Sequence, residues 1–274
     1  MRISEVSKLL DMPITTIRFY EQEGVLSPTR SQNSYREYST VDVYNLMECI
    51  RYRNMGLSVK EIAASLHDEP LCYLRQKVAY QAASVEEQVK RNELKLKCLR
   101  DFEKRLEMLE WNVGNRWIVW QPARDYVIME SGTGEGLGRI DSQDELLRAW
   151  IQELPFVYGV YLVDAKAVLN GQKDRVCCVL MTEKSLAERL RLPAGNRVLS
   201  LPEQVCMRTI LNSREGILPT PQDYQAICGQ VDERYEICGA LTVRLLARCC
   251  DEKNPQRYWE IMVPVRKKQN KIAS

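Results

Sequence analysis

A short run near the N-terminus carries side chains that can contact nucleic acids. Residues 15–20 read Thr-Thr-Ile-Arg-Phe-Tyr and follow Asp11-Met12-Pro13, a segment that ends a helix. Hydroxyl and guanidinium groups are donors that bond to phosphates and base edges. We therefore predict a helix-turn-helix whose second helix enters the major groove. Its predicted DNA-binding residues are Thr15, Thr16, Arg18, Phe19 and Tyr20.

A second group of such residues follows on residues 25–38, a segment rich in turn formers. We expect this segment to form an extended wing beside the recognition helix. Its predicted DNA contacts are Arg30, Ser34, Tyr35, Arg36 and Tyr38, and Lys60 completes the set. For Tyr35 and Tyr38 an alternative is that their rings pack the wing against the helices.

Aromatic residues that could bind a small molecule gather later in the chain, between 111 and 161 and again near 258. If residues 258–265 form a strand, Tyr258, Glu260 and Met262 share one face. A carboxylate beside aromatic rings attracts an organic cation. The predicted effector-binding residues are Trp111, Tyr126, Trp150, Phe156, Tyr158, Tyr258 and Glu260. The alternative is an ordinary aromatic core with Glu260 at its edge.

Metal and catalytic chemistry find little support in the sequence. Ten cysteines are present, but none forms a CxxC pair, and His67 is the sole histidine. We therefore expect no metal site and no cofactor. The sequence has no nucleophile motif, which argues against an enzyme.

The bulk composition is that of an ordinary globular protein. The 274 residues are 45% hydrophobic and carry a net charge of only +2, so a DNA-binding role must rest on local arrangement. The sequence contains no run of about 20 apolar residues, the length needed to span a membrane. The N-terminus lacks the apolar region of a signal peptide, and we expect a cytoplasmic protein.

The elements expected to position the predicted DNA-binding residues near the N-terminus are helices. An apolar stripe predicts a helix near residues 3–10, and Thr15 or Thr16 could cap a second helix that runs to Gly24. Residues 40–55 predict a third helix. The capping box at 58–61, Ser-Val-Lys-Glu, starts a fourth.

A long charged helix is expected over residues 71–110. Apolar residues recur every seven positions, and acid-before-base pairs flank them. This pattern is typical of a dimerising coiled coil with one polar seam residue. The predicted dimer contacts are Val85, Val89, Asn92, Leu96 and Leu99. The alternative is that the helix packs on the C-terminal domain of its own chain.

The remaining sequence predicts an α+β domain made of two strand–helix–strand–strand halves. The first half has strands at 126–131, 158–164 and 175–183, and a helix from a capping box at 142–145 to about 154. The second has strands at 203–212, 239–250 and 257–265, and a helix from Thr220-Pro221 to about Tyr235. The seam between such halves is a natural ligand pocket. The expected domains are therefore a winged helix-turn-helix (1–70), a coiled-coil helix (71–112) and an effector domain (115–270).

The N-terminal residues resemble a known family. The runs Thr16-Ile-Arg-Phe-Tyr-Glu21, Gly24-Val-Leu-Ser-Pro28 and Asn33-Ser-Tyr-Arg-Glu-Tyr38 look like the winged-helix head of MerR-family regulators, as does Met55-Gly56-Leu57-Ser58. The sequence departs from the family pattern at Phe19, often Tyr, and at Ser34, often Gly. The resemblance implies a homodimer that binds double-stranded promoter DNA, bends and untwists it, and lets RNA polymerase holoenzyme engage.

The C-terminal region is similar to the gyrase-inhibitor-like (GyrI-like) effector domain of the multidrug-sensing MerR branch. The duplicated strand order and the closing run 258–265, Tyr-Trp-Glu-Ile-Met-Val-Pro-Val, carry this resemblance. It implies a transcription activator that senses a small molecule. Together with the aromatic rings and Glu260, it leads us to expect a small hydrophobic, cationic effector. Two alternatives are a small-molecule hydrolase and a constitutive DNA-architectural protein.

Overall fold

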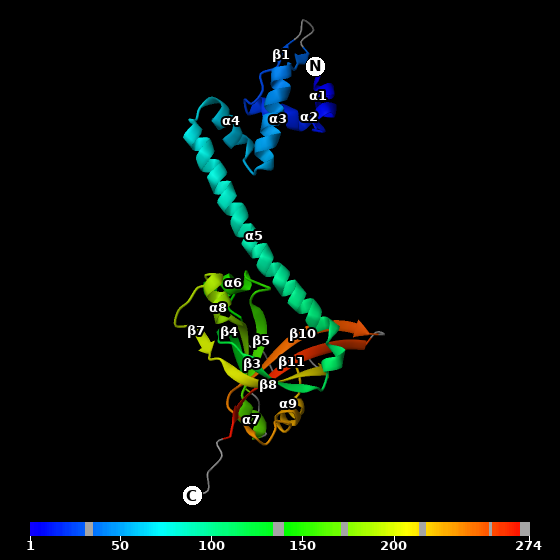
Figure 1. Cartoon of the computed structure of the whole chain (residues 1–274), viewed down its shortest axis with the longest axis vertical. Coiled ribbons are helices and arrows are strands. Elements are labelled where there is room, and N and C mark those ends of the chain that lie inside the picture. The colour runs from blue at the N-terminus through cyan, green and yellow to red at the C-terminus, as the bar shows by residue number, and fades with distance from the viewer. Residues whose placement is uncertain (31–34, 134–139, 171–174, 214–217, 252–253, 269–274) are drawn as a thin grey trace. The chain divides into compact units, whose positions relative to one another are not determined.

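The computed structural model describes the chain except residues 31–34, 134–139, 171–174, 214–217, 252–253 and 269–274 (Figure 1). The chain forms two compact units, Met1–Leu94 and Lys95–Ser274. The helical first unit and the sheet-rich second unit make the protein an α+β protein, as predicted. The three-domain division at 70/71 and 112/115 stays a prediction.

The first unit begins with short helices around one core. Their bounds are α1 Ile3–Leu10, α2 Ile14–Gln22, α3 Thr40–Asn54 and α4 Val59–His67. Between α2 and α3, β1 (Thr29–Arg30) pairs antiparallel with β2 (Arg36–Glu37). The buried core residues are Val6, Met12, Ile17, Tyr20, Val25, Leu26, Tyr38, Val43, Leu46, Cys49, Leu57 and Ile62.

The turn between α1 and α2 differs from the predicted cap. Asp11 adopts the left-handed conformation at φ 47°, which Asp tolerates better than most residues. The N-cap of α2 is Pro13, and no side chain of the described residues caps the first amides. The predicted Thr15 or Thr16 cap is therefore wrong, because the helix begins at Ile14 and both threonines lie within its first turn.

The starts of α3 and α4 are set by side-chain caps. Ser58 and Glu61 form the predicted capping box, with Ser58 N donating to Glu61 Oε2 at 2.9 Å. Ser39 and Asp42 form a second capping box, which sequence reading missed. Each box satisfies amides that a helix N-terminus leaves unpaired.

The long helix α5 runs from Leu71 to Glu107, close to the predicted bounds. Its first turns contact α4 and the turn that precedes it. Gln81 Nε2 donates to the Gly56 carbonyl at 3.0 Å, and Lys77 Nζ lies 2.8 Å from Glu61 Oε1. A backbone φ of 96° favours glycine at position 56, where the chain turns from α3 toward α4.

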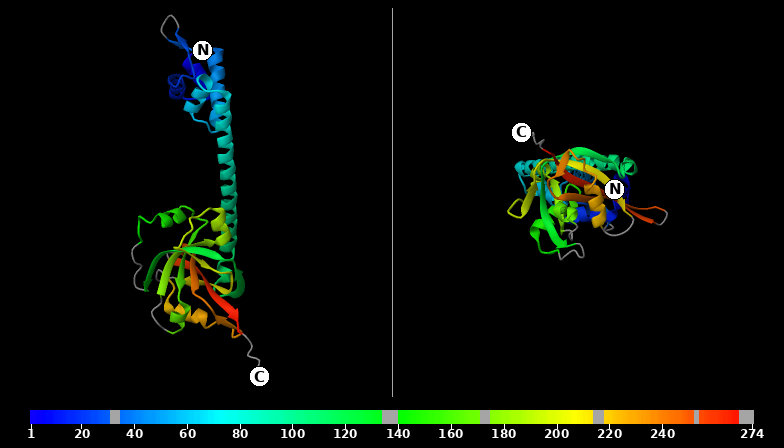
Figure 2. Two further views of the ribbon diagram at one scale, coloured as in Figure 1. Left: turned by 90° about the vertical axis from the view of Figure 1, so that its left-hand side faces the viewer. Right: turned by 90° about the horizontal axis from the view of Figure 1, so that it is seen from below.

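The second unit is built on one antiparallel sheet. Its strands are β3 Arg116–Gln121, β4 Arg124–Thr133, β5 Tyr158–Val163, β6 Arg175–Glu183, β7 Val198–Leu201, β8 Gln204–Ser213, β10 Leu241–Asp251 and β11 Asn254–Lys267, with β9 Tyr235–Ile237 paired to β11. The spatial order is β3-β8-β11-β10-β5-β6-β4-β7. Figure 2 shows how strongly the strands twist across this sheet.

The sheet order confirms two related halves and adds an exchange between them. Strands β5, β6 and β4 mirror β10, β11 and β8, and the halves meet where β5 pairs with β10. The edge strand β3 precedes β4 in the chain but pairs with β8, while β7 precedes β8 but pairs with β4. Each half therefore completes the sheet of the other. Sequence reading predicted neither β3 nor β7.

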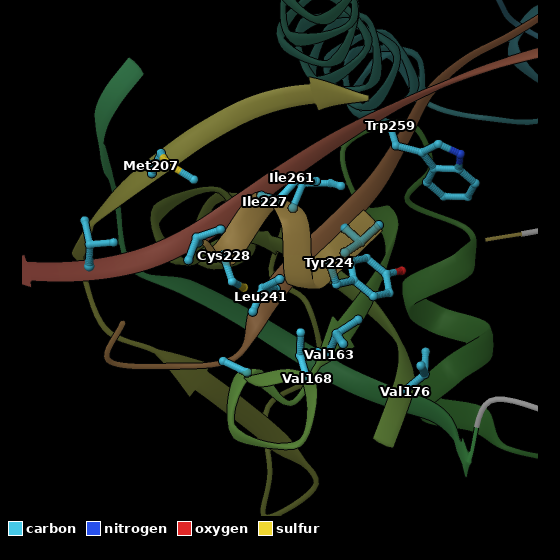
Figure 3. Packing of buried hydrophobic residues seen from close by; sticks show 14 residues of the cluster. Val163, Val168, Val176, Met207, Tyr224, Ile227, Cys228, Leu241, Trp259 and Ile261 are labelled. Carbon is cyan, nitrogen blue, oxygen red and sulfur yellow. The ribbon is translucent and has the colours of Figure 1, made fainter. Parts of the chain in front are cut away.

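Helices cover one face of this sheet. They are α6 Glu145–Ile151, α7 Ala165–Leu169, α8 Lys184–Arg189 and α9 Pro221–Cys228. Figure 3 shows Tyr224, Ile227 and Cys228 of α9 pointing toward Leu241 and Ile261 of the sheet. The largest buried cluster of the second unit therefore lies between α7, α9 and the sheet. A smaller apolar cluster of Val160, Leu162, Val179 and Met181 lies on the opposite face.

Two predicted helix limits in this unit were wrong. Asp144, not Ser142, caps α6, because its Oδ1 accepts from Leu147 N at 3.1 Å, and the helix ends at Ile151. Helix α9 ends at Cys228 instead of continuing to Tyr235, since the chain must turn to form β9. The Thr220-Pro221 start is confirmed, with Asp223 completing a capping box.

Candidate nucleic-acid interface and ligand pocket

Helix α2 presents part of the predicted DNA-binding set to solvent. Thr15, Arg18 and Phe19 are exposed, and Thr16 is half-buried. These residues lie on the outer side of the helix because Ile17 turns into the core. A hydroxyl and a guanidinium therefore project from the exposed surface of the second helix of a helix-turn-helix.

Two predicted DNA contacts are core residues instead. Tyr20 is 4% exposed and Tyr38 is 2% exposed, and both pack in the cluster around Leu46. Burial raises the pKa of both phenols. For Tyr38 the packing alternative is correct, because residue 38 points inward where the wing joins α3. Tyr35 is 75% exposed, so its side chain is accessible for contact with DNA.

The paired strands β1 and β2 supply the predicted wing. Arg36 is exposed, and its Nε lies 2.8 Å from Glu21 Oε1 of α2, which ties the wing to the recognition helix. Arg30 lies in β1, opposite Arg36. Lys60 is exposed in the first turn of α4. The prediction for Ser34 falls outside the described residues.

The predicted dimer seam of α5 is uncovered in the single chain. The exposed fractions of Val85, Val89, Leu96 and Leu99 are between 47% and 56%, and Asn92 is also exposed. None of the residues of α5, all described, is buried. Contact of this apolar row with another surface would remove its side chains from water, which is favourable in free energy.

The predicted effector-binding residues do not form one cluster. Trp111 is 79% exposed. Trp150 is fully buried on the helix-covered side, where it packs with Leu147 and Val127. Phe156 is buried as well. The predicted binding role of Trp150 is therefore wrong in this structure, because the inward face of α6 places its ring in the core.

The other predicted residues lie on the opposite face of the sheet, next to the last turns of α5. Tyr126, Tyr158 and Glu260 occupy alternating positions that share this face by strand register. Tyr258 is also buried and packs against Leu246 and Ile210. The rings of this face are therefore spread over several strands around a central carboxylate.

Glu260 is held by arginines that sequence reading did not single out. Its side chain is 4% exposed, and its Oε1 lies 2.6 Å from Arg208 Nη2 and 3.6 Å from Arg105 Nη1. Arg244 stands directly opposite it in the β10–β11 register. The Arg208 contact is an ion pair without hydrogen-bond geometry. In the sequence, Arg208 and Arg244 follow Met207 and Val243, which are core residues of the opposite face. This alternation could have placed the two arginines on the same face as Glu260.

Two of these guanidinium groups lie on aromatic rings. The Arg244 Cζ is 3.8 Å from the Tyr158 ring centroid, and the Arg208 Cζ is 5.3 Å from that of Trp117. Such stacking stabilises a buried cation by its interaction with the ring face. Burial lowers the pKa of Arg244 and raises that of Tyr158, while Arg244 opposes the rise at Tyr158.

A pocket of about 290 Å³ opens beside this charged centre. Its polar wall is formed by Lys104, Arg105, Arg208 and Asn112. Its apolar wall is formed by Met108, Leu109, Trp117, Ile210 and Leu246. The last turn of α5 and the following residues thus form one side of a cavity whose other side is the sheet.

Metal chemistry has no site in the described part of the chain. No group of three His, Cys, Asp or Glu residues there could hold an ion. Buried Cys49, Cys206 and Cys228 have pKa values raised to about 11 by burial, so these thiols stay protonated. Likewise, no helix among the described residues is long and apolar enough to cross a membrane.

The paired helices and wing of the first unit define a winged helix-turn-helix, and comparison with known proteins gives its family. Residues 1–69 match the family described as "MerR HTH family regulatory protein". This segment is therefore a MerR-family helix-turn-helix domain. The HTH-type transcriptional regulator HmrR of Rhizobium leguminosarum bv. viciae is 43% identical over 61 residues, which are 22% of this chain and 47% of that protein. The chain thus spans about half the length of HmrR.

A second relative matches a longer stretch. The HTH-type transcriptional activator TipA of Streptomyces coelicolor is 26% identical over 175 residues, 54% of this chain and 68% of that protein. HmrR and TipA are named as transcription regulators and not as enzymes. Among solved structures, the EcmrR–DNA complex in EcmrR-RPo is 16% identical with a TM-score of 0.35, covering 98% of this chain and 100% of that one.

Proposed function

We propose that this protein is a dimeric, ligand-responsive transcription regulator. The observation that carries the proposal is the exposed Arg18 on the second helix of a MerR-family helix-turn-helix, beside a wing that bears Arg36. A guanidinium on this helix can reach phosphates or base edges of a duplex, with promoter DNA as the target. The proposed DNA contacts are Thr15, Thr16, Arg18, Phe19, Arg30, Ser34, Tyr35, Arg36 and Lys60.

Dimerisation through α5 is supported by its uncovered seam. A second copy of the helix would bury the apolar row that Val85, Val89 and Leu96 leave in solvent. Asn92 in the same seam would fix the register of the pair. A symmetric dimer would present two recognition helices and therefore bind two half-sites of an inverted repeat.

Regulation would work through α5, because residues of this one helix belong to both units. Gln81 bonds to Gly56 in the first unit, and Arg105 pairs with Glu260 in the second. A ligand that displaces the last turns of α5 would shift the conformational balance of the dimer on its DNA. Activation would follow where the altered dimer bends and untwists the promoter so that RNA polymerase holoenzyme engages it.

The predicted cationic effector is disfavoured by the geometry of Glu260. Its carboxylate already contacts Arg208 and Arg105 and faces Arg244. A cationic ligand would have to displace a guanidinium from a nearly buried ion pair, and the released cation would lie beside it. The proposed sensing role itself does not depend on the charge of the effector.

Selection of random duplexes by the full-length protein tests the proposal. We expect enrichment of an inverted repeat, with an affinity that falls steeply as salt rises because phosphate contacts release counterions. Enrichment of a single half-site would contradict the dimer. No enrichment, with circular dichroism showing a folded protein, would contradict the regulator itself.

A further inference from the structure

We propose that the pocket at the end of α5 binds a small aromatic anion, such as a carboxylate on one or two rings. This inference rests on the proposed function and names the ligand class of its sensing site. The cavity wall contains Lys104, Arg105 and Arg208, and no carboxylate of the described residues lines it. The charge of the pocket is thus positive before any ligand enters.

The charge around the pocket does not cancel. Glu260 forms ion pairs with Arg105 and Arg208 of the wall, and it faces Arg244 on the neighbouring strand. One carboxylate cannot neutralise three guanidinium groups together with the Lys104 ammonium group. In a partly desolvated cavity such an excess attracts an anion more strongly than it would in water.

A further buried arginine lies on the same face of the sheet. Arg124 of β4 is 3% exposed, and its Nε and Nη2 have no hydrogen-bond partner among the residues that the structure describes. Its charge acts on Tyr158 and on Cys206, both on the same face of the sheet as Glu260. Glu183 is its register partner on β6, and the two opposite charges both act on Tyr158. Buried donors without partners are costly unless a ligand or water satisfies them.

The shape of the pocket sets the body of the ligand. Trp117 and Leu246 form an apolar wall, and the guanidinium of Arg208 lies 5.3 Å from the Trp117 ring centroid. An aromatic ring could stack here while its carboxylate pairs with a planar guanidinium fork. The volume of about 290 Å³ lies at the small end of ligand pockets and suits one or two rings.

Two probes of the same shape and opposite charge test the proposal: naphthalene-2-carboxylate and naphthalen-2-ylmethylammonium. Isothermal titration calorimetry of the full-length protein should give a dissociation constant at least about tenfold lower for the carboxylate. Arg105→Gln and Arg208→Gln should each weaken carboxylate binding on the order of tenfold, because each removes a charge-assisted contact. Arg248→Gln, which removes an exposed arginine of strand β10, is the matched control and should leave binding unchanged.

Glu260→Gln separates the two ligand classes. If the pocket takes anions, removing the competing carboxylate should tighten naphthalene-2-carboxylate binding severalfold. Tighter binding of the ammonium probe, lost in Glu260→Gln, would overturn the proposal while leaving a sensing role. Binding of neither probe at millimolar concentration, with inverted-repeat DNA still bound, would overturn the pocket assignment alone. Arg105, which is 40% exposed on α5, provides a variant that should fold normally.

Discussion

Lys77 of α5 and Glu61 of α4 form an ion pair, with Nζ and Oε1 2.8 Å apart. The same carboxylate accepts from Ser58 at the start of α4, so one side chain both caps α4 and joins it to the long helix α5. The Lys77 ammonium and the Ser58 donors lower the pKa of Glu61 from 4.5 to about 2.

The depressed pKa of Glu61 predicts a pH-dependent contribution to stability. The contribution is fully present above the unfolded pKa near 4.5 and is lost as pH falls through the folded pKa near 2. Because both side chains are partly exposed, we expect Glu61→Gln to cost only about 0.5–1 kcal/mol at pH 7. Urea unfolding of the first unit at pH 7 and at pH 2 measures this.

Glu69→Gln is the matched control for that variant, because Glu69 is an exposed carboxylate just beyond α4. Its stability should equal that of the unmodified protein at both pH values. A Glu61→Gln penalty that persists undiminished at pH 2 would contradict the ion-pair origin.

Arg18 is expected to contribute directly to DNA binding. Arg18→Ala should weaken binding to a selected inverted repeat by about 1–3 kcal/mol per protomer, since it removes a base or phosphate contact. If the contact is to phosphate, the salt slope should also fall by about one per protomer. Arg75→Ala, an equal charge change at an exposed position of α5, should leave affinity nearly unchanged in the same titration.

The two wing tyrosines are predicted to behave differently. Tyr38→Ala should destabilise the first unit by about 3–5 kcal/mol, as loss of a large buried ring does. Tyr35→Ala should leave the melting temperature unchanged and weaken only DNA binding, because its ring is 75% exposed. Equal thermal shifts in the two variants would refute this division of roles.

Substitutions in the α5 seam should abolish the dimer. Val89→Lys or Leu96→Lys would place a charge in the apolar contact, where it finds no partner. Glu87→Lys introduces the same side chain on the opposite face of the helix and should keep the dimer intact. Light scattering that gives a dimer mass for all three variants would place the interface elsewhere.

The reactivity of the cysteines should follow their burial. Exposed Cys72, Cys238, Cys249 and Cys250 should react with a disulfide reagent within minutes at pH 8. Cys206 and Cys228, with pKa values raised to about 11, should react only after the second unit unfolds. Fast modification of Cys206 in the folded protein would show that the face of the sheet bearing Glu260 opens readily.

Local patterns in the sequence predicted most elements correctly, and the reason is that they act over a few residues. The capping boxes at Ser58 and Thr220 start helices wherever the rest of the chain lies. The predicted strands at 158–164, 175–183 and 257–265 correspond to β5, β6 and β11. The family motifs of residues 1–69 similarly lie within one short stretch.

The tertiary structure alone decided which charges meet. The sequence marked Glu260 and its strand face, but the distances to Arg105 and Arg208 depend on how α5, β8 and β11 pack together. The same holds for Trp150 and Tyr38, whose rings looked available for ligands and are buried by neighbours distant in the chain. Electrostatic interactions depend on separation in space, which a linear pattern does not contain, so the change from a cationic to an anionic proposed ligand required the folded structure.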